Sequence, residues 1–490
     1  MSDSLAFALF GSGLLVAVAM GEALRARAGL PPEASRRFVH AATGVLVALC
    51  PLWFSQPTGV YVLAGLFVVV NLWAIPRRVF PGMHGIQRRS WGTVTFPLAL
   101  LFALVTCWTL DAGRVYILQT AFLILALSDP LASAVGMGLR RPGRFVVGSN
   151  EKSVAGSLAF FLSAFAVTMG ALAVLGGHGL TVAGSLAAAF VVASLTTGAE
   201  ALASRGWDNF FIVVAAVVPL TMLHGEPEAA GLLVAAVVVA VAFSGAAYAV
   251  GFLDRSGALA TAGLAFSVVV LGPAWAVPGV TFFVLSSLLS KLGRRRKAQA
   301  EKLAEKGSRR DAGQVYANGG VAWALLIAYV FVPVDALYWG YVGAFAAAAA
   351  DTWGTEIGTL AQGPTRLIWS GRRVPPGTSG GVSLAGTLGA LAGATVVFLS
   401  VLPVGGVRLD GVGVAAAALV IVGGGMAAAL VDSLLGATAQ ALYRDASGQL
   451  TERSDSNALV RGWRWLTNDR VNLACTLTGA LLPAAFIALR

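Results

Sequence analysis

Charged residues are scarce in this 490-residue chain, at 12% of the sequence, while 57% of the residues are hydrophobic. A soluble domain carries about 25% charged residues, so an ordinary water-soluble enzyme is excluded. The mean hydropathy of +0.79 is too high for water-soluble cores, because apolar side chains would then cover the surface. The composition therefore predicts a protein whose solvent is the lipid bilayer.

Cysteine is equally scarce, with three residues in the chain. Cys50, Cys107 and Cys475 all lie inside apolar runs, without a CxxC spacing or a nearby histidine. Neither a disulfide framework nor a zinc site is expected, and the three thiols are predicted to be packing residues. The first apolar run, Leu5 to Met20, lacks a preceding basic segment and a following cleavage site, so we expect it to remain as a membrane span.

Apolar stretches long enough to cross the roughly 30 Å hydrocarbon core recur along the whole chain, from Leu5–Ala23 to Asn472–Leu489. The polar loop His224–Glu228 contains a proline and interrupts them, so it forms a natural boundary. The sequence thus predicts an all-α fold, a polytopic integral membrane protein of about 16 transmembrane helices in two bundles. Residues 1–225 would form one bundle and residues 226–490 the other.

Basic residues exceed acidic ones by 34 to 23, which gives a net charge of +11. In a soluble protein this excess suggests nucleic-acid binding, whereas in a membrane protein it reports loop orientation. If the spans alternate, all but three of the 34 basic residues lie on one side, which the positive-inside rule makes cytoplasmic. We expect no nucleic-acid partner, both termini outside, a bacterial-type inner membrane, and active sites on the cytoplasmic face. The basic loop Lys291–Asp311 would lie on that face.

Ionisable side chains at membrane depth cost several kcal/mol, so each one is a candidate for function. Glu33, Arg36, Arg37 and His40 recur at intervals of three or four residues at the cytoplasmic start of a span, on one helix face. Such a face can hold a phosphate. The alternative is that the arginines are flanking positive charges whose side chains snorkel to the surface.

Asp129 lies in an otherwise apolar span, about two turns from its basic cytoplasmic end. A glycine-bounded loop follows, in which Lys152 and Ser153 precede Gly156 at the start of the next helix. A helix start of this kind suits anionic oxygens. A carboxylate, a lysine and a helix start are the usual groups of Mg²⁺-nucleotide sites, so this region predicts phosphate chemistry.

The first half resembles a family on the strength of these motifs: the nucleotide-dependent membrane kinases of isoprenoid alcohols, the dolichol kinase and phytol kinase group, related to the phosphatidate cytidylyltransferases. The resemblance covers about residues 30–225. It rests on Arg36-Arg37 with His40 and Gly44, Trp91-Gly92-Thr93 before Phe96-Pro97, Asp129 with Ala132-Ser133 and Gly136, Lys152-Ser153 with Gly156-Ser157, and Glu200 with Asp208-Asn209. The sequence departs from the family at Ser128, Pro130 and Ala155.

This resemblance implies a set of roles for first-half residues. Asp129 and Lys152 would be catalytic, and Asp129 and Glu200 would bind Mg²⁺. The residues implied to bind nucleotide or phosphate are Arg36, Arg37, His40, Ser153, Gly156, Asp208 and Asn209.

The second half carries a richer set of polar motifs. Asp351 and Glu356 lie five residues apart near the cytoplasmic end of an alanine-rich helix, and Asp432 lies inside another span. The glycines of the turn-rich loop Val374–Ser383 would let backbone N–H groups face a phosphate. Oxygen ligands on one face could hold one or two Mg²⁺ ions, and the expected metal ligands are Asp351, Glu356, Asp432, Asn468, Asp469 and Asn472.

Each of these features also has an ordinary explanation. A Gly-Gly loop is usually a turn, an Asn at a helix start is usually an N-cap, and Asp432 could be a structural hydrogen-bond partner. Their shared cytoplasmic placement favours the functional interpretation of the set.

The second half resembles the integral membrane family that includes plant phytyl-phosphate kinase, over about residues 230–490. The matching residues are Ser256-Gly257-Ala258 with Gly263, Ser290-Lys291 with Gly293, Arg310, Gln314, Asn318-Gly319-Gly320, Asp351-Thr352-Trp353 with Glu356, Pro376-Gly377-Thr378, Gly380-Gly381-Val382-Ser383, Asp432-Ser433 with Gly436-Ala437-Thr438 and Gln440, and Asn468-Asp469 with Val471-Asn472. Ser379 replaces an Asn often found there. The resemblance implies catalysis by Asp351, Glu356 and Asp432, and phosphate binding by Lys291, Arg310, Gln314, Asn318, Gly377, Thr378, Gly380, Gly381 and Ser383.

The two resemblances together imply successive reactions, in which a long-chain isoprenoid alcohol such as phytol becomes first a monophosphate and then a diphosphate. They imply CTP, or UTP, as the phosphate donor and Mg²⁺ as cofactor, in the metabolism of tocopherol, prenylquinone or chlorophyll side chains. The expected partners are the bilayer, the alcohol, its phosphate and the nucleotide. A cytidylyltransferase and a polyprenol or dolichol kinase stay open as alternatives. A transporter, with intramembrane carboxylates and broken helices, is a third.

Overall fold

The computed structural model describes residues 2–29, 31–77, 90–148, 150–176, 179–293, 309–361, 363–405, 412–454 and 458–490. The chain divides into two compact units, Met1–Val238 (unit 1) and Val239–Arg490 (unit 2). The expected boundary between residues 225 and 226 falls thirteen residues before this division, which lies inside a helix. Residues 294–308 of the expected basic loop lie outside the described part of the chain.

The described residues contain 16 α-helices, one for each predicted span. Twelve helical segments have at least 18 residues and are apolar enough to cross a membrane. Two shorter apolar helical segments, Thr58–Ala74 and Arg255–Leu271, add to these. The prediction of an all-α, polytopic integral membrane protein is confirmed.

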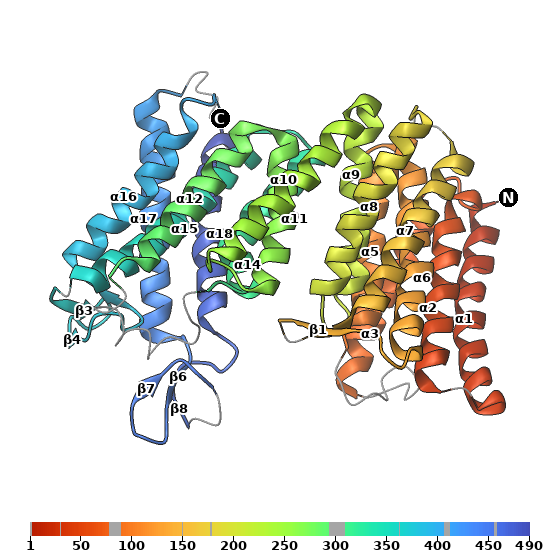
Figure 1. Ribbon diagram of the computed structural model, residues 1–490, viewed down its shortest axis with the longest axis horizontal. Coiled ribbons are helices and arrows are strands. Elements are labelled where there is room, and N and C mark those ends of the chain that lie inside the picture. Colours follow the sequence, from red (N-terminus) through yellow and green to blue (C-terminus); the bar gives the residue numbers. More distant parts are fainter. Residues whose placement is uncertain are drawn as a thin grey trace. The chain divides into compact units, whose positions relative to one another are not determined.

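Unit 1 is a bundle of helices that pack side by side (Figure 1). Its longest buried helix is α6, which packs against α2, α7 and α9. Its helices are α1 (Asp3–Ala28), α2 (Pro32–Leu49), α3 (Thr58–Arg77), α5 (Gly92–Leu104), α6 (Val115–Gly138), α7 (Val154–Leu175), α8 (Val182–Leu202) and α9 (Asp208–Gly225), with short turns η1 (Cys50–Leu52), η2 (Val105–Thr109), η3 (Ala112–Arg114) and η4 (Pro227–Ala229). The strands β1 (Arg144–Val147) and β2 (Asn150–Ser153) form an antiparallel hairpin between α6 and α7.

The junction between that hairpin and α7 depends on small residues. Ser153 caps α7, since its hydroxyl accepts a hydrogen bond from the Gly156 amide at 3.1 Å. A Cβ at Gly156 would lie 2.7 Å from the Ser153 hydroxyl and 3.0 Å from the Ala132 carbonyl oxygen of α6. Gly156 therefore lets α6 and α7 approach closely, beside the residues expected to bind phosphate.

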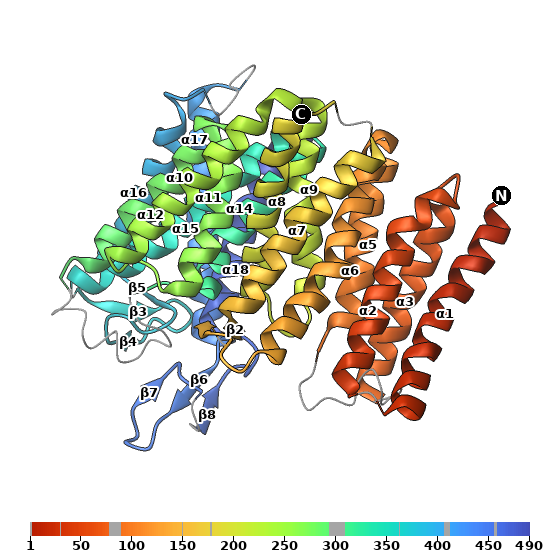
Figure 2. The same ribbon diagram turned by 45° about the vertical axis from the view of Figure 1, so that its right-hand side comes forward.

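Unit 2 combines helices with two small three-stranded antiparallel sheets at one end of the unit (Figure 2). The helix α10 (Ala230–Ala249) crosses the division between the units. The others are α11 (Arg255–Leu271), α12 (Pro273–Lys291), α14 (Ala312–Phe331), α15 (Asp335–Ala361), α16 (Leu384–Val401), α17 (Val414–Thr438) and α18 (Asn468–Ala488). The sheets have the orders β4 (Arg373–Val374), β3 (Thr365–Leu367), β5 (Gly381–Val382) and β7 (Leu450–Thr451), β6 (Leu442–Arg444), β8 (Ala458–Arg461).

The centre of unit 2 is α15, which contacts α12, α14, α16, α17 and α18. Its residues 338–350 are all buried, and many of them are alanine. Small residues on the neighbouring helices match them: a Cβ at Gly393 of α16 would lie 2.6 Å from the Ala349 carbonyl oxygen, and one at Gly425 of α17 would lie 3.1 Å from that of Ala346. Close backbone approach of this kind holds helices together in membranes, where lipid is as apolar as the side chains.

Candidate functional site

Unit 1 contains a cavity of about 1480 Å³ that is lined by the β1–β2 hairpin and by residues of α1, α2, α3, α5, α6, α7, α8 and α9. Small-molecule sites have about 300–1,000 Å³, so this cavity has room for more than a nucleotide. Charged side chains line one end of the cavity, and apolar side chains line the rest. All ten residues that the sequence predicts for the first-half site line it: Arg36, Arg37, His40, Asp129, Lys152, Ser153, Gly156, Glu200, Asp208 and Asn209.

The apolar part of the cavity, here called the apolar arm, runs along α1, α2 and α3. On α1 the lining residues are Phe10, Leu14 and Val18, each one helical turn from the next. Leu63 and Phe67 line it from α3. An apolar cleft between spans for a prenyl tail is what the family resemblance implies, but the sequence does not name its lining residues, because apolar residues one turn apart look like any packed helix face.

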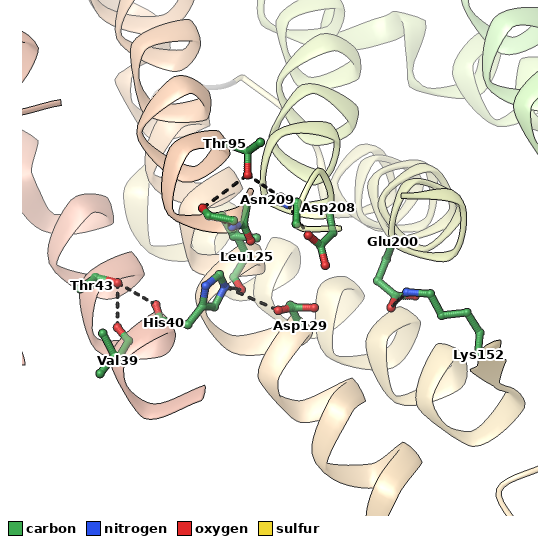
Figure 3. A network of polar contacts seen from close by, with 12 residues as sticks. Val39, His40, Thr43, Thr95, Leu125, Asp129, Lys152, Glu200, Asp208 and Asn209 are labelled. Carbon is green, nitrogen blue, oxygen red and sulfur yellow. Dashed lines mark hydrogen bonds and ion pairs between the residues drawn. The ribbon is translucent and has the colours of Figure 1, made fainter. Parts of the chain in front are cut away.

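His40 and Asp129 face one another where the charged end meets the apolar arm. The His40 Nε2 atom lies 3.1 Å from the Leu125 carbonyl oxygen and 3.6 Å from Oδ2 of Asp129 (Figure 3). Because a carbonyl oxygen only accepts hydrogen bonds, Nε2 carries the proton that it donates to Leu125. Phe96 packs its ring edge-on to His40 with a centroid distance of 5.7 Å, so the imidazole is held in place.

Lys152 of β2 and Glu200 of α8 form an ion pair inside the cavity. The Nζ to Oε1 distance is 2.5 Å, and the two side chains are 18% and 11% exposed. Asn150 anchors the same hairpin, since its Nδ2 donates to the Leu202 carbonyl oxygen at 3.1 Å at the end of α8. The predicted catalytic lysine and the predicted metal-binding glutamate are thus each other's partners, which leaves Glu200 less free for a metal than the sequence suggests.

Asp208 and Asn209 begin α9 and differ in what they contact. Asn209 donates through Nδ2 to the Gly92 carbonyl oxygen at 2.9 Å and so ties α9 to the start of α5. Thr95 of α5 donates to the Gly206 carbonyl oxygen in the same junction. The Asp208 carboxylate instead points toward Asp129 (Figure 3), and the two carboxylates interact electrostatically.

The charged end fits a Mg²⁺ ion shared with nucleotide phosphates better than one enclosed by protein. Mg²⁺ is usually held by one or two carboxylates together with phosphates and water. Asp129 and Asp208 supply two carboxylates that face one cavity. No group of three or more His, Cys, Asp and Glu suited to a metal occurs among the residues that the structure describes.

Cations at the charged end belong to α2 and the hairpin. Arg37 lies 3.8 Å from Glu33, and its Nε is buried without a hydrogen-bond partner in the described part of the chain. Arg144 and Glu151 of the hairpin, which the sequence motifs do not single out, also line the cavity and pair at 2.9 Å. A phosphate-rich ligand would meet these cations first.

Unit 2 brings Asp351 of α15 and Asp432 of α17 together. Their carboxyl groups interact with each other, and two adjacent carboxylates repel unless a proton or a cation lies between them. The Asp432 Oδ1 atom is buried without a hydrogen-bond partner within the described ranges. One turn deeper, Ala347, Ala428 and Cys475 of α18 form a buried cluster, which brings the three helices close enough for the carboxyl pair.

Glu356 lies apart from this pair. Five residues on an α-helix turn the side chain by roughly 500°, so Asp351 and Glu356 occupy different faces of α15. The Glu356 carboxylate accepts a hydrogen bond from the Ser290 hydroxyl of α12 at 2.5 Å and interacts with Arg310. Burial lowers the pKa of Arg310 to about 10, and Glu356 opposes that shift. The structure therefore does not bring Asp351, Glu356 and Asp432 together in one group.

Several predicted phosphate-binding residues of unit 2 have partners within the fold. Lys291 donates to the Val250 carbonyl oxygen at 2.5 Å. Gln314 forms a capping box with Asp311 at the start of α14, and Asn318 donates to the Gln314 carbonyl oxygen at 3.0 Å. These contacts give each of the three residues a structural role in the fold, while their role in phosphate binding stays a prediction.

The predicted glycine loop packs against the end of α17. Gly380 has φ +78°, and a Cβ there would overlap the Ala437 backbone. Gly377 also has a positive φ, of +86°. Thr378 donates to the Pro375 carbonyl oxygen at 2.8 Å. The loop ends where Ser383 caps α16 by accepting from Gly386 at 3.1 Å, and Gly381 lies in β5. The loop is thereby placed near Asp432, six residues before the end of α17.

Two functional candidates in unit 2 escaped the sequence analysis, Glu452 and Arg461. Glu452 interacts electrostatically with Asp432 and accepts a hydrogen bond from Ser379. Arg461 donates to the Gly436 carbonyl oxygen at 2.7 Å. Glu452 and Asn468 also line a cavity of about 40 Å³. The sequence indicates these two residues only through the charged segment after α17, which it predicts to be a cytoplasmic loop.

Asn468, Asp469 and Asn472 all lie in the first turns of α18. Asn472 is one turn from Cys475 toward the carboxyl pair, because α18 runs opposite to α15 and α17. Asp469 lies in the first turn, where an acidic side chain favours the helix dipole.

Comparison with known proteins gives the family. The model of the integral membrane protein family DUF92 matches residues 238–480. Protein PGR of Arabidopsis thaliana is 31% identical over 236 residues, which cover 42% of this chain and 79% of that protein. The chain belongs to the DUF92 integral membrane family. An uncharacterized membrane protein of Methanocaldococcus jannaschii is 30% identical over 232 residues, covering 47% of this chain and 84% of its own.

A further relative is an uncharacterized membrane protein of Synechocystis, 27% identical over 206 residues, which cover 41% of this chain and 70% of that protein. No solved structure matches the chain. The DUF92 match begins at residue 238, one residue before unit 2 begins, and contains every residue predicted for the second site. The family description states a membrane location and no reaction.

Proposed function

We propose that this protein is a bifunctional isoprenoid alcohol kinase. Unit 1 phosphorylates phytol or a similar prenol, and unit 2 phosphorylates the resulting monophosphate to the diphosphate. The observation that carries the proposal is the cavity of unit 1, which joins a charged end to an apolar arm. Such a cavity suits a ligand with an apolar tail and a reacting hydroxyl, and burial of the tail contributes about 0.8 kcal/mol per CH₂.

The junction between the two parts of the cavity is where the hydroxyl would lie. On α2 the lining changes from Arg36 and Arg37 to Val47 as the helix passes His40. A tail in the apolar arm therefore brings its hydroxyl to His40 and Asp129. Asp129 is placed to accept the hydroxyl proton, while His40 orients Asp129.

The transfer itself follows from these positions. The alcohol oxygen bonds to the γ-phosphorus of CTP, the bond from that phosphorus to the β,γ-bridging oxygen breaks, and CDP leaves. Arg36, Arg37 and Lys152 neutralise the charge on the transferring phosphoryl group. Asp129 and Asp208 would hold Mg²⁺, which supplies further charge neutralisation at the phosphates.

Unit 2 supports the second step through its carboxyl pair. Asp351 and Asp432 would hold Mg²⁺, a role for which the unpartnered Asp432 Oδ1 is suited. The glycine loop 375–383 would present backbone N–H groups, and Arg461 a cation, to the phosphates. The resemblance to phytyl-phosphate kinase and membership of DUF92 are consistent with this role.

Both sites would face the cytoplasm of a bacterial-type inner membrane. The charged end of the cavity lies at the starts of α2, α7 and α9 and at the ends of α6 and α8. These are the ends at which the basic residues of the sequence gather, and the positive-inside rule assigns that side to the cytoplasm.

Labelled nucleotide separates this proposal from its alternatives. Membranes containing the protein are incubated with phytol, Mg²⁺ and CTP labelled either at the γ-phosphate or in the cytosine ring. A kinase transfers only the γ-label to lipid, whereas a cytidylyltransferase transfers the cytosine label. If neither label reaches lipid and CTP is not consumed by the purified protein, the transporter alternative replaces the proposal.

A further inference from the structure

The apolar arm of the unit 1 cavity has a closed end. The lining residue farthest from the charged end is Phe10 on α1, Val47 on α2, Leu63 on α3 and Leu100 on α5. All four side chains are buried, with 7% exposure at most. The arm therefore ends inside the protein at these residues.

An aromatic cluster behind Phe10 closes this end. The Phe10 ring packs edge-on against Phe54, with centroids 5.8 Å apart, and against Trp53 at 6.2 Å. Phe54 is buried, and a Cβ at Gly59 would lie only 2.8 Å from its ring, so the start of α3 holds it in place. The end of the arm is thus a rigid wall.

The arm is about as long as one lipid leaflet. On α1 its apolar lining runs from Phe10 to Val18, eight residues apart, which corresponds to roughly 12 Å. Half of the hydrocarbon core is about 15 Å. A tail of about one leaflet's length fits between the junction at His40 and the wall at Phe10, and a much longer tail does not.

We infer that Phe10 and the residues around it set the chain length of the lipid alcohol. The arm accepts an isoprenoid alcohol with a tail of one leaflet's length, such as phytol or geranylgeraniol, and rejects long polyprenols such as dolichol. This inference rests on the proposed function, because it concerns the same cavity, and it separates phytol-type alcohols from the polyprenol alternative.

The test measures binding and reaction separately on the purified full-length protein. Binding is read without nucleotide, from the rise in Tm that phytol, farnesol or dolichol causes in detergent. Reaction is read as kcat/KM with CTP and Mg²⁺. Wild-type protein is expected to favour phytol over dolichol by about tenfold or more in both measurements, since each mismatch in an apolar pocket costs about tenfold.

Two variants change the arm in opposite directions. Phe10→Ala removes the side chain at the end of the arm. It is expected to raise the ratio of kcat/KM for dolichol to kcat/KM for phytol about tenfold. Val47→Phe shortens the arm and is expected to shift preference from phytol toward farnesol, so it carries the test even if Phe10→Ala fails to fold. The control is Leu9→Ala, because Leu9 is next to Phe10 but 54% exposed and outside the cavity lining.

The outcomes separate this inference from the proposed kinase function. Equal preference for phytol and dolichol in wild type, unchanged in both arm variants, overturns the chain-length role even if lipid phosphate is formed. Phytol binding whose chain-length preference shifts in the variants, without any phosphorylation, supports the chain-length role and overturns the kinase.

Discussion

The imidazole of His40 and the carboxylate of Asp129 face each other from α2 and α6, with Nε2 3.6 Å from Oδ2. The 88 residues of chain between them fold so that this pair lies where the charged and apolar cavity walls meet. An alcohol whose tail fills the apolar arm would present its hydroxyl at this pair.

The first prediction concerns Asp129 as proton acceptor. Asp129→Asn keeps the size of the side chain but removes its basicity and the negative charge that would help to hold Mg²⁺, so formation of lipid monophosphate is expected to fall by about 10²–10⁴-fold. The measurement is monophosphate formed from phytol and CTP. The control is Asp111→Asn, near the start of α6, where Asp111 pairs with Arg114 away from the cavity. An active Asp129→Asn variant would contradict the assignment.

The second prediction concerns the ion pair of Lys152 and Glu200. Lys152→Met leaves a mostly buried carboxylate without its partner, which is expected to lower the free energy of unfolding by about 2 kcal/mol. The pair Arg144–Glu151 of the same hairpin is the control, because both side chains are more than half exposed and Arg144→Met should change stability by less than about 0.5 kcal/mol. Thermal unfolding of nucleotide-free protein measures both. Equal free energies of unfolding for Lys152→Met and Arg144→Met would show that the buried pair does not stabilise the fold.

The third prediction divides the two reactions between the units. Asp351→Asn and Asp432→Asn each disturb the carboxyl pair of unit 2, so conversion of phytyl monophosphate to diphosphate is expected to fall by at least about 10²-fold. Monophosphate formation from phytol should stay within about twofold of wild type, because the pair lies in another unit. Accumulation of monophosphate checks the prediction. Normal diphosphate formation by Asp351→Asn would contradict it.

The fourth prediction concerns the glycine loop of unit 2. Gly380→Ala strains a backbone with φ +78° and also collides with Ala437. Gly371→Ala, at φ +66° with no atom within 4 Å of its Cβ, introduces similar strain without the collision. Both variants are expected to lose about 1 kcal/mol from the strain. Only Gly380→Ala should also lose diphosphate formation, as measured by product analysis. Equal activity of the two variants would remove the loop from the second site.

The membrane fold and much of the unit 1 site could be predicted from sequence. Most apolar runs are long enough to cross the bilayer, and ionisable residues inside such runs are costly enough to stand out, as Asp129 does. All ten residues predicted for unit 1 line one cavity. The residues that line the apolar arm were missed, since Phe10 and Leu14 have the same spacing as ordinary packing residues.

The unit 2 site was harder to predict, because the spacing of residues along one helix does not show which side chains of other helices they contact. Asp351 and Glu356 are close in sequence, yet they lie on different faces of α15. Asp351 interacts with Asp432, and Glu356 accepts a hydrogen bond from Ser290. Glu452 was missed because it lies directly after strand β7 of a small sheet rather than in a membrane span. A charged residue in a loop outside the membrane costs little free energy, so its presence in the sequence does not indicate a functional site.

The central claim is tested most directly by following the products over time. Purified full-length protein in phospholipid vesicles is given phytol, CTP and Mg²⁺, and the lipids are analysed by mass spectrometry. The proposal predicts that phytyl monophosphate appears first and is then converted to phytyl diphosphate, with release of CDP in both steps. Unchanged phytol, or a lipid that carries CMP, would contradict it.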